Sequence, residues 1–224
     1  MEKTRTIRTW GSFLLLLLLL FVFLIWNVLA GSVKLPVSEI LEILRGRGDG
    51  TQSRILLQIR LPRLLSALIL GGALSVSGYL LQTFFHNPIA GPFVLGISSG
   101  AKLCVSIVMI LLLSRGLVSS SAALIAAAFV GAMGSMGFVL AVSQKVKRMS
   151  LLVICGVMIG YICTAATDLL VTFADDSNIV NLHNWSMGSF SGMSWENVGT
   201  MAIVCGAAFV LVFFLSKPIR AYQL

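Results

Sequence analysis

The most informative stretch of this chain is residues 60–102, RLPRLLSALILGGALSVSGYLLQTFFHNPIAGPFVLGISSGAK. An apolar run of membrane-spanning length starts beside Pro62 and ends at Asn87-Pro88. A glycine-rich loop with almost no charge then leads into more apolar sequence. A helix that is interrupted in this way leaves backbone N–H and C=O groups unpaired, and lipid does not satisfy them. Because such a break is tolerated where protein or a water-filled path covers it, the stretch is typical of a transport pathway.

The composition of the 224-residue chain is that of an integral membrane protein. Hydrophobic residues make up 58% of the chain, charged residues 11%, and the mean hydropathy is +0.99, whereas about a quarter of a soluble domain is charged. The net charge is +8, and the cations lie in short clusters between apolar runs. That distribution orients a chain in a membrane and attracts anionic lipid. It lacks the basic stripe with aromatic platforms that nucleic-acid binding requires, so no nucleic-acid partner is expected.

The apolar runs predict an all-α, polytopic transmembrane helical bundle with about six spans. The runs are 13–30, 62–85, 98–113, 121–142, 151–173 and 198–215. The first run also resembles a cleaved signal peptide, but its length and the bulky Trp26 favour a retained span. The cations Lys3, Arg5 and Arg8 precede this run. They predict an N-terminus in the cytoplasm, because positive charge favours the inner side.

Two polar segments between the spans are expected on the outer face. The first, residues 34–63, contains a short amphipathic helix that we expect on the membrane surface, with Ser38 as its N-cap. Six cations in this segment oppose the positive-inside tendency, which favours docking of an acidic partner. The second segment, residues 175–196, is acidic, and its Trp185 and Trp195 are expected to anchor it at the membrane interface.

Small residues recur at helical spacing along several spans, which permits close approach of neighbouring helices. The candidate helix-packing positions are Gly71, Ser75, Gly78, Gly96 and Gly100. The fifth span carries Gly156 and Gly160 as a GxxxG pair. Glycines of this kind usually serve packing, and they can also line a path at a packed interface.

Motifs for catalysis or metal binding are weak in this sequence. Residues 96–100 fit GxSxG, but the pattern needs a strand, a sharp turn and a histidine relay, so an intramembrane hydrolase is disfavoured. Asp168 stands alone in its span and is expected at a solvated rim. His86 and His183 fall on opposite sides of the expected membrane, so no metal site is predicted. The sequence also lacks the GxxxxGK[ST] motif of a nucleotide site. No catalytic residue and no cofactor are therefore predicted on this chain.

The residues of the quoted stretch resemble the FecCD-type permeases. These proteins are the membrane subunits of binding-protein-dependent ABC importers for ferric siderophores, haem and cobalamin. The matching residues are Arg60-Leu-Pro-Arg63, the small-residue helix up to Gln82, Asn87-Pro-Ile-Ala90, Leu95-Gly96 and Ser99-Gly-Ala101. The region around Gly156 and residues 185–189 also look like that family.

The resemblance implies an ABC importer permease, of which residues 1–224 form a single transmembrane domain that is incomplete at its C-terminus. The implied partners are a second permease subunit in a homodimer, two ATPase subunits that bind ATP and magnesium, and an extracytoplasmic substrate-binding protein. The implied location is the cytoplasmic (inner) membrane, in contact with membrane lipid. A ferric siderophore is the expected cargo, and haem and cobalamin are the alternatives. A truncated, non-transporting membrane scaffold is the alternative function.

The resemblance also implies roles for single residues. Arg60 and Arg63 match outer-face arginines that pair with acidic residues of the binding protein, and anchoring to lipid headgroups is the alternative. The residues carried over for the translocation pathway and its gate are Asn87, Ser150, Gly156 and Gly160. The match at Ser150 is loose. Asn87 can also cap the break by bonding the backbone that the proline frees.

Overall fold

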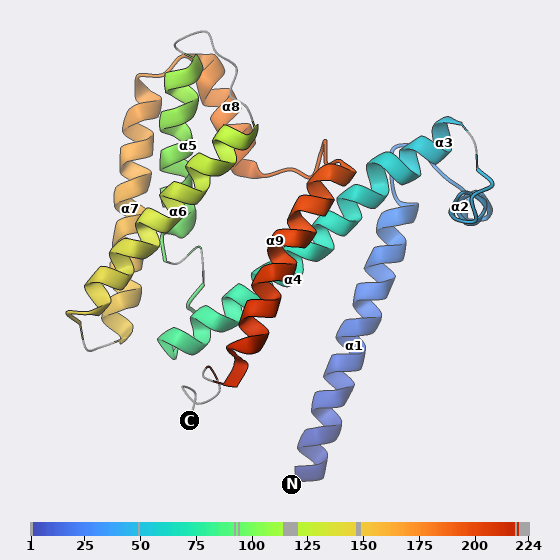
Figure 1. The fold of residues 1–224 in the computed structure, drawn as a ribbon, viewed down its shortest axis with the longest axis horizontal. Helices are drawn as coiled ribbons and strands as arrows, with labels where there is room; N and C mark the ends of the chain where they lie inside the picture. The colour runs from blue at the N-terminus through green and yellow to red at the C-terminus, as the bar shows by residue number, and fades with distance from the viewer. Residues whose placement is uncertain are drawn as a thin grey trace. The chain divides into compact units, whose positions relative to one another are not determined.

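The computed structural model describes residues 2–48, 50–91, 93, 95–113, 121–146, 149–217 and 219, and this part of the chain contains helices and no strand (Figure 1). The helices are α1 (Glu2–Leu29), α2 (Val37–Leu44), α3 (Thr51–Arg54), the π-helical segment η1 (Ile55–Arg60), α4 (Leu61–Phe85), α5 (Ile97–Leu113), α6 (Ser121–Ser143), α7 (Met149–Thr172), α8 (Asp176–Met187) and α9 (Trp195–Phe214). The prediction of an all-α fold is confirmed.

The helical runs have the lengths that membrane crossing requires. Five of them in the described chain are long and apolar enough by length and composition: Thr6–Leu29, Thr51–Phe85, Ser121–Ser143, Leu151–Thr172 and Trp195–Phe214. The third expected span corresponds to α5, a shorter apolar helix of 17 residues, which is near the lower limit for crossing a hydrocarbon core. These runs lie where the sequence places its six spans.

The chain divides into two compact units. The first unit consists of Met1–Gly72 and Phe190–Leu211, and the second consists of Ala73–Ser189 and Val212–Leu224. The segment around Arg60 therefore belongs to the first unit, and the interrupted stretch after Phe85 belongs to the second.

α3, η1 and α4 form one continuous helix from Thr51 to Phe85, and the part of it up to Gly72 belongs to the first unit. The expected start at Pro62 is therefore wrong, because the helix passes through the proline. A π-helix bonds each N–H to the carbonyl five residues before it, and Pro62 has no N–H to offer Leu57. The indole Nε1–H of Trp195 donates to the Leu57 carbonyl instead, at 2.8 Å. This contact ties the first turn of α9 to the widened turn.

The α2 helix is held by apolar contacts within the first unit. Ile40 and Ile43 are each 5% exposed and pack in one cluster with Leu35 and the fully buried Leu56 of η1. Ile40 and Ile43 thus cover η1, whereas Leu41 and Leu44 stay exposed. The location of this helix on the membrane surface stays a prediction. Ser38 is not the N-cap, since α2 begins at Val37 and Pro36 holds the cap position.

In the second unit, α5 contacts α6, α7 and α8 (Figure 1). One cluster of buried residues, made by Phe85, Ala90, Leu95, Val139 and Leu152, surrounds the loop before α5. A second cluster, made by Val105, Met109, Ala127 and Leu182, joins the body of α5 to α6 and α8. The broken stretch is thus partly covered by protein, since Phe85, Ala90 and Leu95 are buried while Ile89 and Phe93 stay exposed.

The α8 helix has no counterpart among the predicted elements. Its sequence is too polar for a span, so the segment reads as a linker, yet it forms 12 helical residues between Asp175 and Gly188. Asp176 stabilises the first turn through the helix dipole, and Gly188 ends the helix with a φ of 71°, a conformation that glycine adopts without strain. Leu182 and the partly buried Trp185 pack this helix against the cluster on α5.

Candidate docking and transport sites

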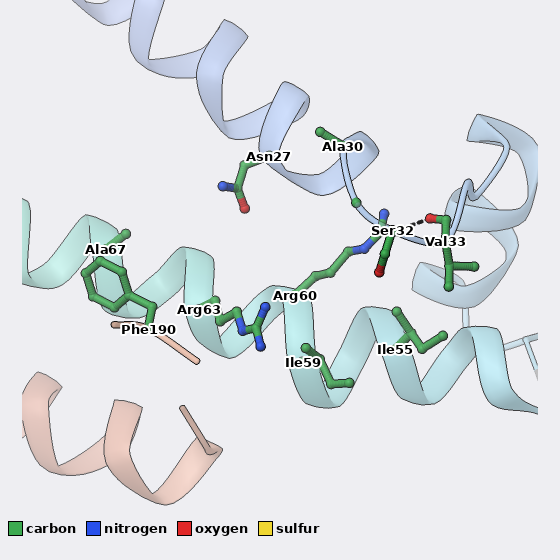
Figure 2. Close-up of a pocket in the computed structure, with 11 residues that line it drawn as sticks. Asn27, Ala30, Ser32, Val33, Ile55, Ile59, Arg60, Arg63, Ala67 and Phe190 are labelled. Atoms are coloured by element: carbon green, nitrogen blue, oxygen red, sulfur yellow. Dashed lines mark hydrogen bonds between the residues drawn. The ribbon is translucent and has the colours of Figure 1, made fainter. Parts of the chain in front are cut away.

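The first candidate site is a cavity of about 520 Å³ at the end of α1, within the first unit (Figure 2). Both arginines of the Arg60-Leu-Pro-Arg63 motif line it. The other lining residues are Asn27, Ala30, Gly31, Ser32, Val33, Ile55, Ile59, Ala67 and Phe190. The cavity therefore lies between the C-terminal end of α1, η1 and the first turns of α4.

Arg60 is buried in the wall of this cavity, with 7% of its surface exposed. Its guanidinium donates to the carbonyl of Val28 at 2.6 Å, to that of Leu29 at 3.4 Å and to that of Val33. The last carbonyls of a helix have no partner within the helix and carry its negative dipole end. Arg60 supplies both the donors and the positive charge that this end requires.

Gly31 provides the space for the Arg60 side chain. A Cβ at Gly31 would lie 2.8 Å from Cζ of Arg60, which is inside van der Waals contact. The sequence indicates none of this, because the partners of Arg60 lie about thirty positions earlier in the chain.

Arg63, one helical turn later, is exposed and makes no hydrogen bond or ion pair with any residue that the structure describes. Figure 2 shows Arg60 reaching the 32–33 segment, whereas Arg63 stays on the α4 side of the cavity beside Phe190. The two arginines thus do not present a matched pair of charges. Arg60 is buried against the end of α1, and Arg63 keeps its charge at the surface. The docking role of both arginines stays a prediction.

The break after α4 lies in the second unit and is closed by local hydrogen bonds. The Oδ1 atom of Asn87 accepts from the N–H of Ile89 at 3.0 Å, and its carbonyl accepts from the N–H of Ala90 at 3.1 Å. His86 adopts a positive φ of 48°, which turns the chain out of the helix. These are the contacts of the capping interpretation of Asn87. These hydrogen bonds do not test whether Asn87 also acts as a gate, and that role stays a prediction.

The loop then packs its backbone against α7. Gly96 has a φ of 72°, and a Cβ there would lie 2.7 Å from the Gly156 carbonyl oxygen and 2.8 Å from the Gly160 nitrogen. A Cβ at Gly156 would likewise lie 2.9 Å from Cα of Leu95. The GxxxG pair of α7 therefore forms a shallow groove that receives the 95–96 turn.

The other small residues differ in their surroundings. Gly100 approaches α6 so closely that a Cβ would lie 2.6 Å from the Gly131 carbonyl oxygen. A Cβ at Gly71 or Gly78 would meet no described atom within 4 Å outside its own helix, and Ser75 is exposed. Ser150 lies in the first turn of α7, and its side chain is outside the described part of the chain.

A second cavity, of about 510 Å³, opens between α5, α7 and α8. Its lining residues are Phe93, Ser98, Ser99, Ala101, Lys102, Thr164, Thr167, Asp168, Trp185 and Ser186. The sequence assigns no role to Lys102 and predicts Asp168 at a solvated rim; in the structure Lys102 is half-buried and Asp168 is exposed. The available signal was a charge within each apolar run, which is costly in a membrane and for that reason usually functional.

Comparison with known proteins places the chain in a family. Residues 17–224 match the sequence model of the FecCD transport family. The chain is similar to the hemin transport system permease protein HmuU of Yersinia pestis, with 32% identity over 171 residues that cover 76% of this chain and 51% of the relative. It is also similar to the vitamin B12 import system permease protein BtuC of Klebsiella pneumoniae, with 35% identity over 199 residues, 89% of this chain and 56% of the relative.

A solved structure shows the same fold. An inward-facing conformation of a metal-chelate type ABC transporter superposes with a TM-score of 0.76 and 26% identity, over 93% of this chain and 63% of the solved chain. The present chain thus spans about half the length of the curated relatives it matches. The family match covers nearly all of the chain, and the helical architecture agrees with it. The chain belongs to the FecCD transport family.

Proposed function

We propose that this chain is a permease subunit of an ABC importer that moves a metal chelate across the cytoplasmic membrane. The observation that carries the proposal is the partly covered break in the second unit. Phe85, Ala90 and Leu95 are 0–1% exposed around an irregular loop between apolar helices, whereas Ile89 and Phe93 of the same loop stay exposed. Non-helical backbone at membrane depth occurs where protein or a water-filled path surrounds it. Family membership supports the same function.

The names of two relatives favour haem and vitamin B12 as the first cargoes to test. The ferric siderophore expected from the resemblance stays a prediction. In this proposal the path lies between two permease subunits of a homodimer, and Asn87, Ser150, Gly156 and Gly160 contribute to the path and its inner gate. Transport proceeds by alternating access, in which packed helices open the path to one side at a time.

The proposed partners supply energy and cargo. Two ATPase subunits bind ATP and magnesium on the cytoplasmic side, where the N-terminus of this chain also lies. An extracytoplasmic substrate-binding protein delivers the chelate to the outer face. Arg63 is the proposed docking residue on this chain, because its charge is exposed and unpaired among the described residues, and a guanidinium binds a carboxylate in a planar, bidentate geometry.

Uptake tests the proposed function directly. Proteoliposomes that hold the permease with its ATPase and binding protein are expected to accumulate haem or cobalamin when Mg-ATP is supplied. The matched control replaces ATP with a non-hydrolysable analogue. Vesicles that accumulate no chelate, although the three components assemble, would contradict the proposal.

Docking is tested by charge reversal at the exposed arginine. Arg63→Glu should weaken binding of the substrate-binding protein several-fold at low salt, because a rim ion pair contributes ~0.2–1 kcal/mol and the reversal adds repulsion. Lys145→Glu is the control, since it changes the same charge in an exposed loop after α6. The difference should shrink as salt screens the charges. Equal affinities of Arg63→Glu and the parent protein across a salt series would remove the docking assignment.

A further inference from the structure

The cavity between α5, α7 and α8 brings together two charges that the sequence separates by more than sixty positions. Lys102 comes from the second turn of α5, and Asp168 comes from the last turns of α7. We propose that this cavity is a subsite for an anionic oxygen group of the chelate cargo, with Lys102 as its counter-charge and Asp168 as the group that limits its affinity. This inference rests on the proposed function and names the part of the cargo that the chain recognises.

The register between α5 and α7 fixes which side chains meet in the cavity. Gly96 lies against Gly160, and the hydroxyl groups of Ser99 and Thr164 lie 3.4 Å apart. One turn further along each helix, at i+3 and i+4, are Lys102 and Asp168. The close glycine contact below therefore sets the separation of the two helices at the level of the charges.

Lys102 and Asp168 both line this cavity and form no bond to each other. The side chain of Lys102 is half-buried, and that of Asp168 is exposed. Neither Lys102 nor Asp168 forms an ion pair or side-chain hydrogen bond with another residue in the part of the chain that the structure describes. An ionisable side chain within a span costs ~2.5–3.5 kcal/mol on insertion scales, and it usually faces a path or a partner. A cargo group that enters between the two helices would find the half-buried ammonium group of Lys102 as a donor.

The remaining lining suits the edge of an organic chelate. Trp185 on α8 is partly buried and presents part of its ring to the cavity, while the hydroxyl groups of Ser98 and Ser99 add polar atoms beside Lys102. Thr167 and Ser186 donate to carbonyls of their own helices, those of Cys163 and His183, each at 2.8 Å. Their oxygens therefore act as acceptors, which leaves Lys102 as the charged donor among the described lining residues.

Because Lys102 and Asp168 carry opposite charges, the proposal predicts that their substitutions change the affinity for an anionic cargo in opposite directions. Removal of the Lys102 charge should weaken binding of an anionic cargo by about tenfold or more, because a hydrogen bond to a charged group is lost. Removal of the Asp168 charge should strengthen binding several-fold, because a repulsive carboxylate is lost. A purely structural role for the two residues would instead weaken binding in both variants.

The experiment measures haem and cobalamin binding to the full chain in neutral phosphatidylcholine nanodiscs. Lys102→Gln should weaken haem binding and Asp168→Asn should strengthen it. Lys145→Gln, an exposed lysine outside the cavity, should change nothing. Haem dimethyl ester, which lacks free carboxylates, should bind Lys102→Gln and the parent chain equally. Shifts of the same sign in both cavity variants would overturn the proposal.

Two further measurements separate the sources of failure. If anionic phosphatidylglycerol displaces haem from the parent chain and not from Lys102→Gln, a lipid headgroup occupies the cavity, and the cargo assignment is overturned. If neither haem nor cobalamin binds the parent chain, these two cargoes are excluded from the proposed function. Thiol labelling then measures the charge preference of the cavity without a cargo.

The labelling uses Ser186→Cys in a chain whose four native cysteines are replaced by alanine. The rate ratio of an anionic to a cationic methanethiosulfonate reagent should fall with Lys102→Gln and rise with Asp168→Asn. A ratio that neither substitution changes would show that the two charges do not act in the cavity and would overturn the proposal independently of the cargo.

Discussion

The small residues of α4 and those of α5 and α7 share a helical spacing, but they meet different surroundings. A Cβ at Gly96 would lie 2.7–2.8 Å from backbone atoms of α7, and a Cβ at Gly100 would collide with the Ser135 hydroxyl group of α6 and lie 2.6 Å from the Gly131 carbonyl oxygen. At Gly71 and Gly78, no described atom lies within 4 Å outside the helix itself. The same spacing of small residues thus occurs in two settings. We call a glycine closed where another segment packs directly against it, and open where no described atom outside its own helix lies within 4 Å. Spacing alone specifies which residues share a face, and the opposing segment decides what the face does.

The two arginines repeat this contrast over a single helical turn. Arg60 and Arg63 belong to one motif and have the same side chain. The α1 end happens to lie within reach of the first and not of the second, so Arg60 is buried on three carbonyls and Arg63 is exposed. A shared motif therefore does not imply a shared role.

The largest effect is expected where a Cβ would collide with backbone at a positive φ. Gly96→Ala should destabilise the protein by about 2–4 kcal/mol, because overpacking and a left-handed conformation are both penalised. Thermal unfolding of the detergent-solubilised chain measures the change. Gly78→Ala is the matched control and should be neutral or slightly stabilising, since alanine favours a helix. Equal losses for the two variants would erase the contrast between closed and open glycines.

A smaller loss is expected from the buried arginine. Arg60→Gln should cost about 2–3 kcal/mol, because it removes charged hydrogen bonds and leaves carbonyls at the end of α1 without their donor. Arg63→Gln should leave the unfolding midpoint nearly unchanged, since the exposed side chain bonds to no described residue. Limited proteolysis in the 30–36 connection provides a local readout, and cleavage should accelerate for Arg60→Gln alone. Acceleration in both variants would mean that the arginines are equivalent after all.

The smallest effect tests the widened turn that precedes both arginines. Trp195→Phe keeps the apolar ring and removes the indole donor to the Leu57 carbonyl. The expected loss is about 1 kcal/mol, because the side chain is 49% exposed and water can replace the donor. Hydrogen exchange should rise locally in η1 and not in α7. An unchanged exchange rate in η1 would show that the turn is stable without this bond.

The helices that cross the membrane were predictable from sequence, because apolar composition and length act within each segment. The start of the second span was not. Pro62 predicts a helix start by its missing N–H, and only the π-helical turn and the distant Trp195 allow the helix to pass through it. The α8 helix was missed for a similar reason, since its polar sequence is stabilised by packing of Leu182 on α5 rather than by its own periodicity.

The sequence by itself determined a polytopic helical membrane protein, its interrupted stretch and its family, because hydropathy and local motifs are properties of contiguous residues. Tertiary structure decided which glycines are closed, which arginine is buried and which two charges share a cavity. Those outcomes depend on residues that are distant in the chain and become neighbours through the register of packed helices. Lys102 and Asp168 line one cavity because Gly96 allows α5 to approach Gly160, and no pattern within either helix predicts that the other helix lies there.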